Sequence, residues 1–195
     1  MGRIVDLSHP IEPHWRPSWL NERQVHASFA TGNWQSSIVT LSCHGFTHVD
    51  APLHRFPDGK TLDQVPLETF VGTAYIVDLA DTAPNTAITA DLVAARGGHI
   101  RPGGIVVLKT LWEEKASHQT KEFWTTAPFV TQPAAEWILG QRPKAVAFDF
   151  PPAFCFRYPH LDPAERARHT DRYAPPRQSC PTASAPLNTC ATWGR

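Results

Sequence analysis

The sequence predicts a single α/β domain, and three observations point to it. Strand-like apolar runs alternate with helix-like segments between residues 71 and 148, an order typical of α/β proteins. The 195 residues are 42% hydrophobic and 18% charged, an ordinary composition for a globular chain. Valine and isoleucine occur twenty times in residues 1–150 and not at all in residues 151–195, so we expect the core to come from the earlier part.

The first third is predicted to be rich in strands. Residues 4–7 form a short apolar run, and residues 10–19 hold three prolines and two tryptophans, which predicts an ordered loop rather than a helix. Residues 25–29 and 37–41 are strand-like and are separated by turn residues, so they predict an antiparallel hairpin. The second hairpin strand leads directly into a cluster of histidines.

The middle of the chain carries strands and helices in alternation. Val71–Leu79, Ile105–Leu108 and Ala145–Phe148 are predicted strands. Thr89 and Thr131 are predicted N-caps of two helices, over residues 90–96 and 134–139, that end at glycines.

The chain changes character after Pro151. Residues 151–195 contain eight prolines and no apolar periodicity, so we expect an extended tail without a regular strand, with one or two helical turns at 163–168. We therefore divide the chain into a domain at residues 1–155 and an atypical proline-rich tail at residues 156–195.

Charge and cysteine content exclude several classes of protein. Eighteen basic and eighteen acidic residues balance, which gives no electrostatic reason to expect a nucleic acid or an anionic membrane as partner. No apolar run is long enough to cross a bilayer and no signal peptide is evident. The four cysteines show no C-x-x-C pair, so we expect free thiols and a cytoplasmic location.

The densest chemistry lies in the segment His44-Gly-Phe-Thr-His48-Val-Asp50-Ala-Pro-Leu-His54. Imidazoles and a carboxylate are the ligands that Zn²⁺ or Mn²⁺ prefers, and three protein ligands leave a position for water. We predict that His44, His48 and Asp50 bind the metal and that Thr47 orients a ligand through its hydroxyl. His54 is predicted to move protons as the catalytic acid or base, because the pKa of histidine lies near working pH.

Other signals are weaker and leave alternatives open. Trp15 and Trp19 could stack on an aromatic substrate or simply pack the loop. Asp149 lies at the end of a predicted strand, where it could join a site or serve as a cap. His9 and His14 have no partner at a metal-ligand spacing, and His160 and His169 lie in the tail.

The segment from His44 to His54 resembles the H-x-G-T-H-x-D-x-P-x-H signature of the metal-dependent cyclase family, which includes kynurenine formamidases (arylformamidases) and isatin hydrolases. The resemblance extends to Val5–Ile11, Val71–Leu79, Ile100–Leu108 and Ala145–Asp149, and so covers roughly residues 3–155. It implies a swivelling β/β/α fold, a homodimer or larger oligomer, and one or two zinc or manganese ions.

The resemblance also implies an activity and roles for residues. His44, His48 and Asp50 match the ligands of the first metal, His54 matches the catalytic acid/base, and Trp15 matches a substrate-contacting tryptophan. The implied reaction is hydrolysis of a small amide, as when N-formylkynurenine gives kynurenine and formate in tryptophan catabolism. Alternatives with the same site are a catalytically impaired metal-binding protein and a cyclase or dehydratase acting on another carbonyl substrate.

Two departures from the family pattern stand out. Phe46 occupies a position where the signature has glycine, so the turn must adopt a conformation that a side chain tolerates there. The family's late histidine and its glutamate in a Val/Ile-rich strand have no counterpart, since Glu165 has no matching surroundings and His169 matches only faintly. We therefore expect an incomplete second-metal site, and we hypothesise that roughly the last 25 residues are a replaced or out-of-frame C-terminus.

Overall fold

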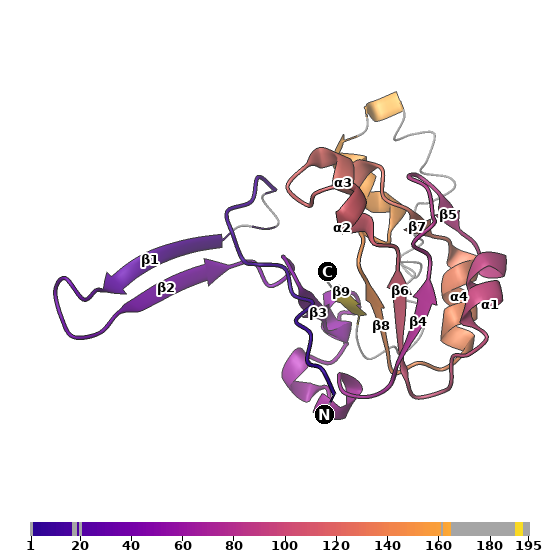
Figure 1. Ribbon diagram of the computed structural model, residues 1–195, viewed down its shortest axis with the longest axis horizontal. Coiled ribbons are helices and arrows are strands. Elements are labelled where there is room, and N and C mark those ends of the chain that lie inside the picture. Colours follow the sequence, from indigo (N-terminus) through magenta and orange to yellow (C-terminus); the bar gives the residue numbers. More distant parts are fainter. Residues whose placement is uncertain (1, 17–18, 20, 161, 165–189, 193–195) are drawn as a thin grey trace.

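A five-stranded sheet built largely on the predicted apolar runs forms the centre of the molecule (Figure 1). The computed structural model describes residues 2–16, 19, 21–160, 162–164 and 190–192. The strands lie in the order β3 (His48–Asp50), β9 (Cys190–Thr192), β8 (Ala145–Phe148), β6 (Ile105–Lys109) and β4 (Ala74–Asp78). The last four run parallel to one another, whereas β3 pairs antiparallel with β9. The predicted α/β class and the three predicted strands of the middle region are confirmed.

Two helices cover one face of this sheet. Helices α1 (Ala90–Gly97) and α4 (Gln132–Gly140) lie side by side against it (Figure 1). Their inward side chains, Val93 and Ile138, are 0% and 3% exposed and pack in the core with strand residues such as Val106. Both predicted caps are confirmed. The Thr89 hydroxyl accepts a hydrogen bond from the main-chain N–H of Leu92, and the Thr131 hydroxyl accepts one from that of Ala134.

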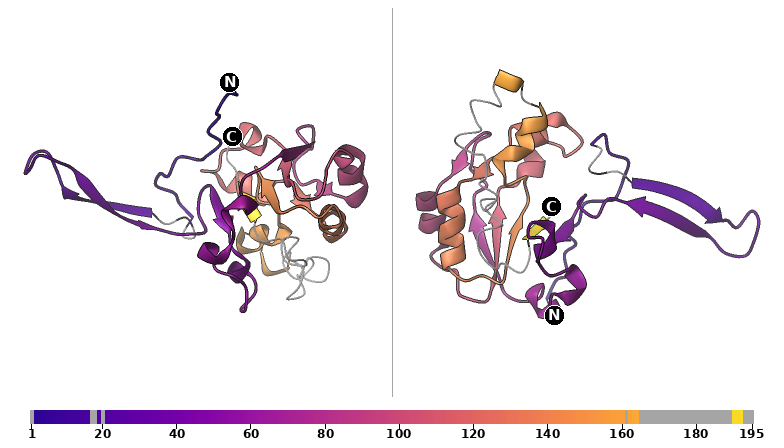
Figure 2. Two further views of the ribbon diagram at one scale, coloured as in Figure 1. Left: turned by 90° about the horizontal axis from the view of Figure 1, so that it is seen from below. Right: turned by 180° about the vertical axis from the view of Figure 1, so that it is seen from behind.

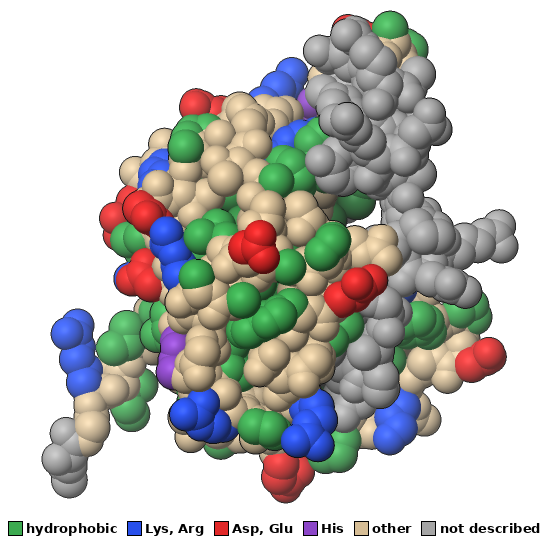
Figure 3. All heavy atoms as spheres, turned by 90° about the vertical axis from the view of Figure 1, so that its right-hand side faces the viewer, with side chains coloured by type: hydrophobic (Ala, Val, Ile, Leu, Met, Phe, Trp, Pro, Cys, Tyr) green, Lys and Arg blue, Asp and Glu red, His purple; other side chains and the backbone are tan. Residues whose placement is uncertain are grey.

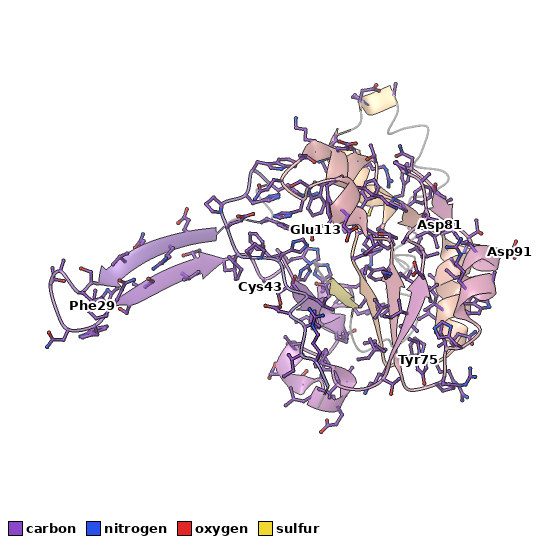
Figure 4. The ribbon with its side chains drawn as sticks, in the orientation of Figure 1. Phe29, Cys43, Tyr75, Asp81, Asp91 and Glu113 are labelled. Carbon is purple, nitrogen blue, oxygen red and sulfur yellow. The ribbon has the colours of Figure 1, made fainter. Side chains whose placement is uncertain are left out.

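The predicted hairpin forms and extends away from the body of the molecule. Strands β1 (Asn21–Ala27) and β2 (Ser36–Leu41) pair antiparallel, and Figures 1 and 2 show them projecting as a two-stranded arm. Phe29 lies near the tip of this arm (Figure 4). The inner end of β2 leads into the turn that carries His44, as the sequence predicts.

Several short elements have no signal in the sequence pattern, because each is too short to show a period. They are η2 (Pro52–His54), η3 (Leu62–Gln64), η4 (Leu67–Thr69), β5 (Ala87–Ile88), α2 (Trp112–Lys115), α3 (Lys121–Thr125), β7 (Phe129–Val130) and η5 (Phe154–His160). Strands β5 and β7 form a separate parallel pair. Helices α2 and α3 lie beyond the end of β6 (Figure 1) and matter for the site below.

Two expectations about the ends of the chain are wrong. Residues 4–7 form no strand: Ile4 is 97% exposed and Val5 54% exposed, and no strand among the described residues pairs with this run. The tail does supply a strand, since β9 inserts between β3 and β8. A strand with neighbours on both sides gains its backbone hydrogen bonds from them and needs no valine or isoleucine. The domain boundary near residue 155 stays a prediction, and most of the predicted helical turn at 163–168 falls outside the described residues.

The surface over α1 and α4 carries both signs of charge. Figure 3 shows acidic and basic side chains interspersed with apolar ones on this side, without a patch of a single sign. Among the described residues, no helix is long and apolar enough to span a membrane. Cys43 and Cys155 are free thiols, as expected, and Cys180 lies outside the described residues.

Candidate metal centre and its surroundings

The turn between β2 and β3 brings His44 next to the two candidate ligands of β3. The chain leaves β2, turns through residues 42–47 and enters β3, where His48 and Asp50 are two residues apart and so point to the same side of the strand. Phe46 sits in this turn with φ of 57°, the left-handed region, and its side chain is only 2% exposed against Trp19. The expectation of a conformation that a side chain tolerates is therefore wrong: Phe46 keeps the left-handed backbone that favours glycine, and packing against Trp19 holds it there.

The three predicted ligands converge on one point. His44 Nδ1 lies 2.9 Å from Asp50 Oδ1 and 2.9 Å from His48 Nε2, and His48 Nε2 lies 3.4 Å from Asp50 Oδ1. Ligand atoms about 2.0–2.1 Å from a tetrahedral zinc ion stand about 3.3 Å apart, so this triangle is close to the size that such an ion requires. Two nitrogens and one carboxylate oxygen fit Zn²⁺ or Mn²⁺ equally well.

Hydrogen bonds and charge favour the cation-binding form of these groups. His48 Nδ1 lies 2.7 Å from the Phe46 main-chain oxygen, so Nδ1 carries the proton and the lone pair of Nε2 faces the cluster. Burial would raise the pKa of the Asp50 carboxyl, but without a metal ion the His44 and His48 rings carry protons in its place, hydrogen-bond to the carboxyl and hold its pKa well below its usual range. Asp50 is therefore a carboxylate at neutral pH.

His54 lies beside the cluster without joining the ligand triangle. Helix η2 places its ring against that of His44, with ring centroids 4.3 Å apart and an interplanar angle of 27°. Partial burial lowers the pKa of His54, and the Asp50 charge opposes that effect. His54 is exposed and lies next to the candidate metal position, which is the place where a proton carrier would be needed.

Trp15 lies in a different aromatic group. Its ring stacks on His14, with centroids 5.6 Å apart, and meets His160 edge-on at 5.8 Å. No ring contact within the described part of the chain joins Trp15 to His44 or His54. The substrate-contacting role of Trp15 stays a prediction.

The contacts bear on two further residues. The hydroxyl of Thr47 accepts a hydrogen bond from the main-chain N–H of His9 at 2.8 Å and so positions the N-terminal segment, while its role in orienting a metal ligand stays a prediction. The Asp149 carboxylate accepts hydrogen bonds from the Thr110 hydroxyl and from the main-chain N–H groups of Thr110 and Leu111. Of the two readings open for Asp149, the structure supports the capping one.

A second group of potential ligands is one that sequence spacing could not reveal. His9, Glu113 and His118 come together although His9 is more than 100 residues from the other two. His14, also without a spacing partner, lies with its Nε2 atom 2.9 Å from the His118 main-chain oxygen. Glu113 faces the side of the body from which the arm extends (Figure 4). The late residues Glu165 and His169 lie outside the described residues.

Comparison with known proteins places this geometry in a family. The family model described as "Putative cyclase" matches residues 5–153. Kynurenine formamidase of Salinibacter ruber is 36% identical over 88 residues, which are 42% of this chain and 41% of that protein. Cyclase-like protein 3 of Oryza sativa subsp. japonica is 31% identical over 163 residues, 76% of this chain and 58% of that protein. The chain thus spans about half the length of these curated relatives.

Solved structures share the fold. Isatin hydrolase A from Labrenzia aggregata matches with a TM-score of 0.72 at 18% identity, covering 99% of this chain and 81% of that one. Isatin hydrolase A from Ralstonia solanacearum matches with a TM-score of 0.68 at 20% identity, covering 97% and 78%. The mixed α/β domain expected from the resemblance is confirmed.

Proposed function

Because this chain belongs to the cyclase family, we propose that it is a metal-dependent hydrolase that cleaves a carbon–nitrogen bond in a small amide or formamide. The observation that carries this proposal is the triangle of His44, His48 and Asp50 with the His54 ring stacked beside it. The partial match to a protein named kynurenine formamidase makes N-formylkynurenine the first substrate to test.

Each residue has a task in this reaction. A divalent ion bound at the triangle would lower the pKa of a water ligand toward about 7 and so supply a nucleophile at neutral pH. His48, fixed by the Phe46 carbonyl, keeps its Nε2 lone pair directed at the triangle, and Asp50 contributes the negative charge. With a water held at the triangle, His54 would take one of its protons and the water oxygen would bond to the amide carbonyl carbon. As the carbon–nitrogen bond breaks, His54 would give that proton to the departing amine.

The ion proposed for this site is Zn²⁺ or Mn²⁺, and the ligand set suits both. Trp15 is proposed to contact an aromatic substrate, as the resemblance implies. A second ion shared by Asp50 would need ligands from the tail, which the described residues do not provide.

The test compares hydrolysis of N-formylkynurenine by wild type, His54→Ala and His26→Ala, with bound metal measured for each. His26 is an exposed histidine on the arm and serves as the matched control. We expect His54→Ala to keep its metal and lose about 10²–10⁴-fold in kcat, the usual contribution of an acid–base group. His26→Ala should retain full activity.

The same measurement separates the alternatives. Metal-loaded wild type that is as inactive as His54→Ala on aryl and alkyl formamides would support the catalytically impaired member of the family. Formation of a dehydrated or cyclised product from a hydroxy-carbonyl substrate, without amide hydrolysis, would support the cyclase or dehydratase. Absence of stoichiometric zinc or manganese would overturn all of these assignments to the triangle.

A further inference from the structure

A second cluster of ligand-type side chains lies where the N-terminal segment meets helix α2. Glu113 Oε1 is 3.0 Å from His9 Nδ1 and 2.9 Å from His118 Nδ1, and one ligand atom from each residue lies within 4.8 Å of the others. The three side chains are 7%, 12% and 10% exposed in the order His9, Glu113, His118. They are therefore more buried than the His44 side chain of the first cluster, which is 40% exposed.

The cluster is built into the fold rather than formed by chance at the surface. The His118 main-chain oxygen accepts a hydrogen bond from the Trp124 indole at 3.1 Å, and His14 Nε2 lies 2.9 Å from the same oxygen. Glu113 lies in α2, whose first residue, Trp112, is 1% exposed in the core. Glu113 and His118 therefore come from one short stretch of chain, and these contacts fix its position.

Among the described residues, the ion-pair partners of the Glu113 carboxylate are two histidines, which balance its charge only when one of them is protonated. Its second oxygen, Oε2, is buried and has no hydrogen-bond partner among the described residues. A buried carboxylate is costly unless it is paired or coordinates a cation. A positive charge at the cluster would therefore stabilise the Glu113 carboxylate.

We propose that His9, Glu113 and His118 form a second divalent-cation site, most suited to Zn²⁺ and distinct from the His44 triangle. Two histidines and one glutamate are a known zinc ligand set with an open coordination position. His118 Nε2 makes no hydrogen bond within the described part of the chain but lies 3.4 Å from Glu12 Oε1, an ion-pair distance. A proton on Nε2 is favoured beside this carboxylate and leaves the Nδ1 lone pair for the cation.

The open position of this site would face a cavity. All three ligands line a cavity of about 430 Å³, together with Ser8, Glu12 and Gln119. A water molecule or a small anion could reach the ion there. The site would also tie the N-terminal segment to the first cluster, because the His9 main-chain N–H donates to Thr47, the residue before His48.

Zinc content after exhaustive dialysis tests the proposal, with Glu113→Gln as the key variant and Glu114→Gln as its matched control. Glutamine keeps the shape of the side chain but not its charge, and Glu114 is the exposed neighbour. We expect two zinc ions per chain in wild type and in Glu114→Gln, and one in Glu113→Gln. Affinity at this site should fall at least about 100-fold, since loss of even an outer partner costs 10–100-fold.

A second background separates this site from the first. In the His48→Ala variant we expect one remaining equivalent of bound metal. With Co²⁺ as the probe it gives an absorption band, and this band should disappear in the double variant His48→Ala/Glu113→Gln. If Glu113→Gln binds as much metal as Glu114→Gln in both backgrounds, the second site does not exist. Loss of metal in Glu113→Gln but not in His48→Ala would sustain the second site and overturn the metal role of the His44 triangle.

A readout on the metal-free wild type removes any dependence on how the variants fold. Addition of Zn²⁺ should shift the ring-nitrogen resonances of His9 and His118 in ¹⁵N-histidine spectra. Unchanged His9 and His118 signals at saturating Zn²⁺ would overturn the proposal.

Discussion

The Nδ1 atom of His48 lies 2.7 Å from the main-chain oxygen of Phe46, two residues earlier in the chain. This hydrogen bond forms because the Phe46 backbone is left-handed, with φ of 57°, which turns its carbonyl back toward β3. A phenylalanine in that conformation is costly, by about 1–2 kcal/mol. Its burial against Trp19, with ring centroids 4.7 Å apart, offsets the cost.

Substitutions at Phe46 test this balance. Phe46→Ala removes the packing and keeps a β-carbon in the left-handed region, so we expect a loss of about 3–5 kcal/mol in the free energy of unfolding. Phe46→Gly removes the same packing but relieves the backbone, and it should be more stable than Phe46→Ala by about 1 kcal/mol. Urea unfolding of the two metal-free variants measures the difference. An alanine variant as stable as the glycine variant would contradict the strained turn.

Gly59 controls the position of His54. A β-carbon at Gly59 would lie 2.5 Å from the Pro52 main-chain carbon and 2.6 Å from the Leu53 nitrogen, and backbone atoms of η2 cannot yield without moving the helix. We expect Gly59→Ala to shift His54 off the His44 ring and to lower kcat by about 10²-fold, the scale expected for a misplacement near 1 Å. Zinc content should be unchanged.

Gly32→Ala in the arm is the matched control, because a β-carbon there meets nothing closer than 3.9 Å. Equal activities of Gly59→Ala and Gly32→Ala under saturating substrate would show that the position of η2 does not matter for the reaction.

The Thr110 hydroxyl, 0% exposed, donates to Asp149 at 2.7 Å, and its removal should cost more at high pH than at low pH. Burial raises the pKa of Asp149, while hydrogen bonds from Thr110 and Leu111 oppose that effect. Thr110→Val removes one opposing bond and raises the folded-state pKa further. The proton is then held more tightly in the folded than in the unfolded variant, so stability falls as pH rises through the carboxyl range.

At pH 7 we expect Thr110→Val to be less stable than wild type by about 1.5–3 kcal/mol, the value of a hydrogen bond to a charged group. The deficit should shrink at pH 4 in urea unfolding. Thr126→Val, which removes a hydroxyl bonded to the neutral Glu122 carbonyl, should show a deficit independent of pH. A pH-independent deficit in Thr110→Val as well would refute the ionised Asp149 acceptor.

The projecting arm bears on the predicted homodimer. Phe29 and Trp34 are 71% and 58% exposed at its outer end, and large apolar side chains there would gain about 1.5–3 kcal/mol each if a second copy covered them. We expect wild type to sediment as a dimer and Phe29→Glu/Trp34→Glu to sediment as a monomer. Leu67→Glu, which changes a residue 77% exposed on the body, should leave the dimer intact. A wild-type monomer at micromolar concentration would overturn the prediction.

The sequence by itself determined the parts of this protein that depend on near neighbours in the chain. Strands β4, β6 and β8 follow from apolar runs, helices α1 and α4 from threonine caps and glycine ends, and the hairpin from its turn residues. The cluster of His44, His48 and Asp50 could also be found, because seven consecutive residues hold it and a strand brings alternate side chains to one side.

Tertiary structure alone decided what depends on distant contacts. The strand β9 has no apolar signal and exists through its pairing with β3 and β8, whereas no strand in the described part of the chain pairs with the apolar run at residues 4–7. His9 and His118 show no metal-ligand spacing in the sequence, yet both contact Glu113 because the fold brings the N-terminal segment to α2. Spacing reports geometry only within one local element, and contacts between elements are set by how the whole core packs.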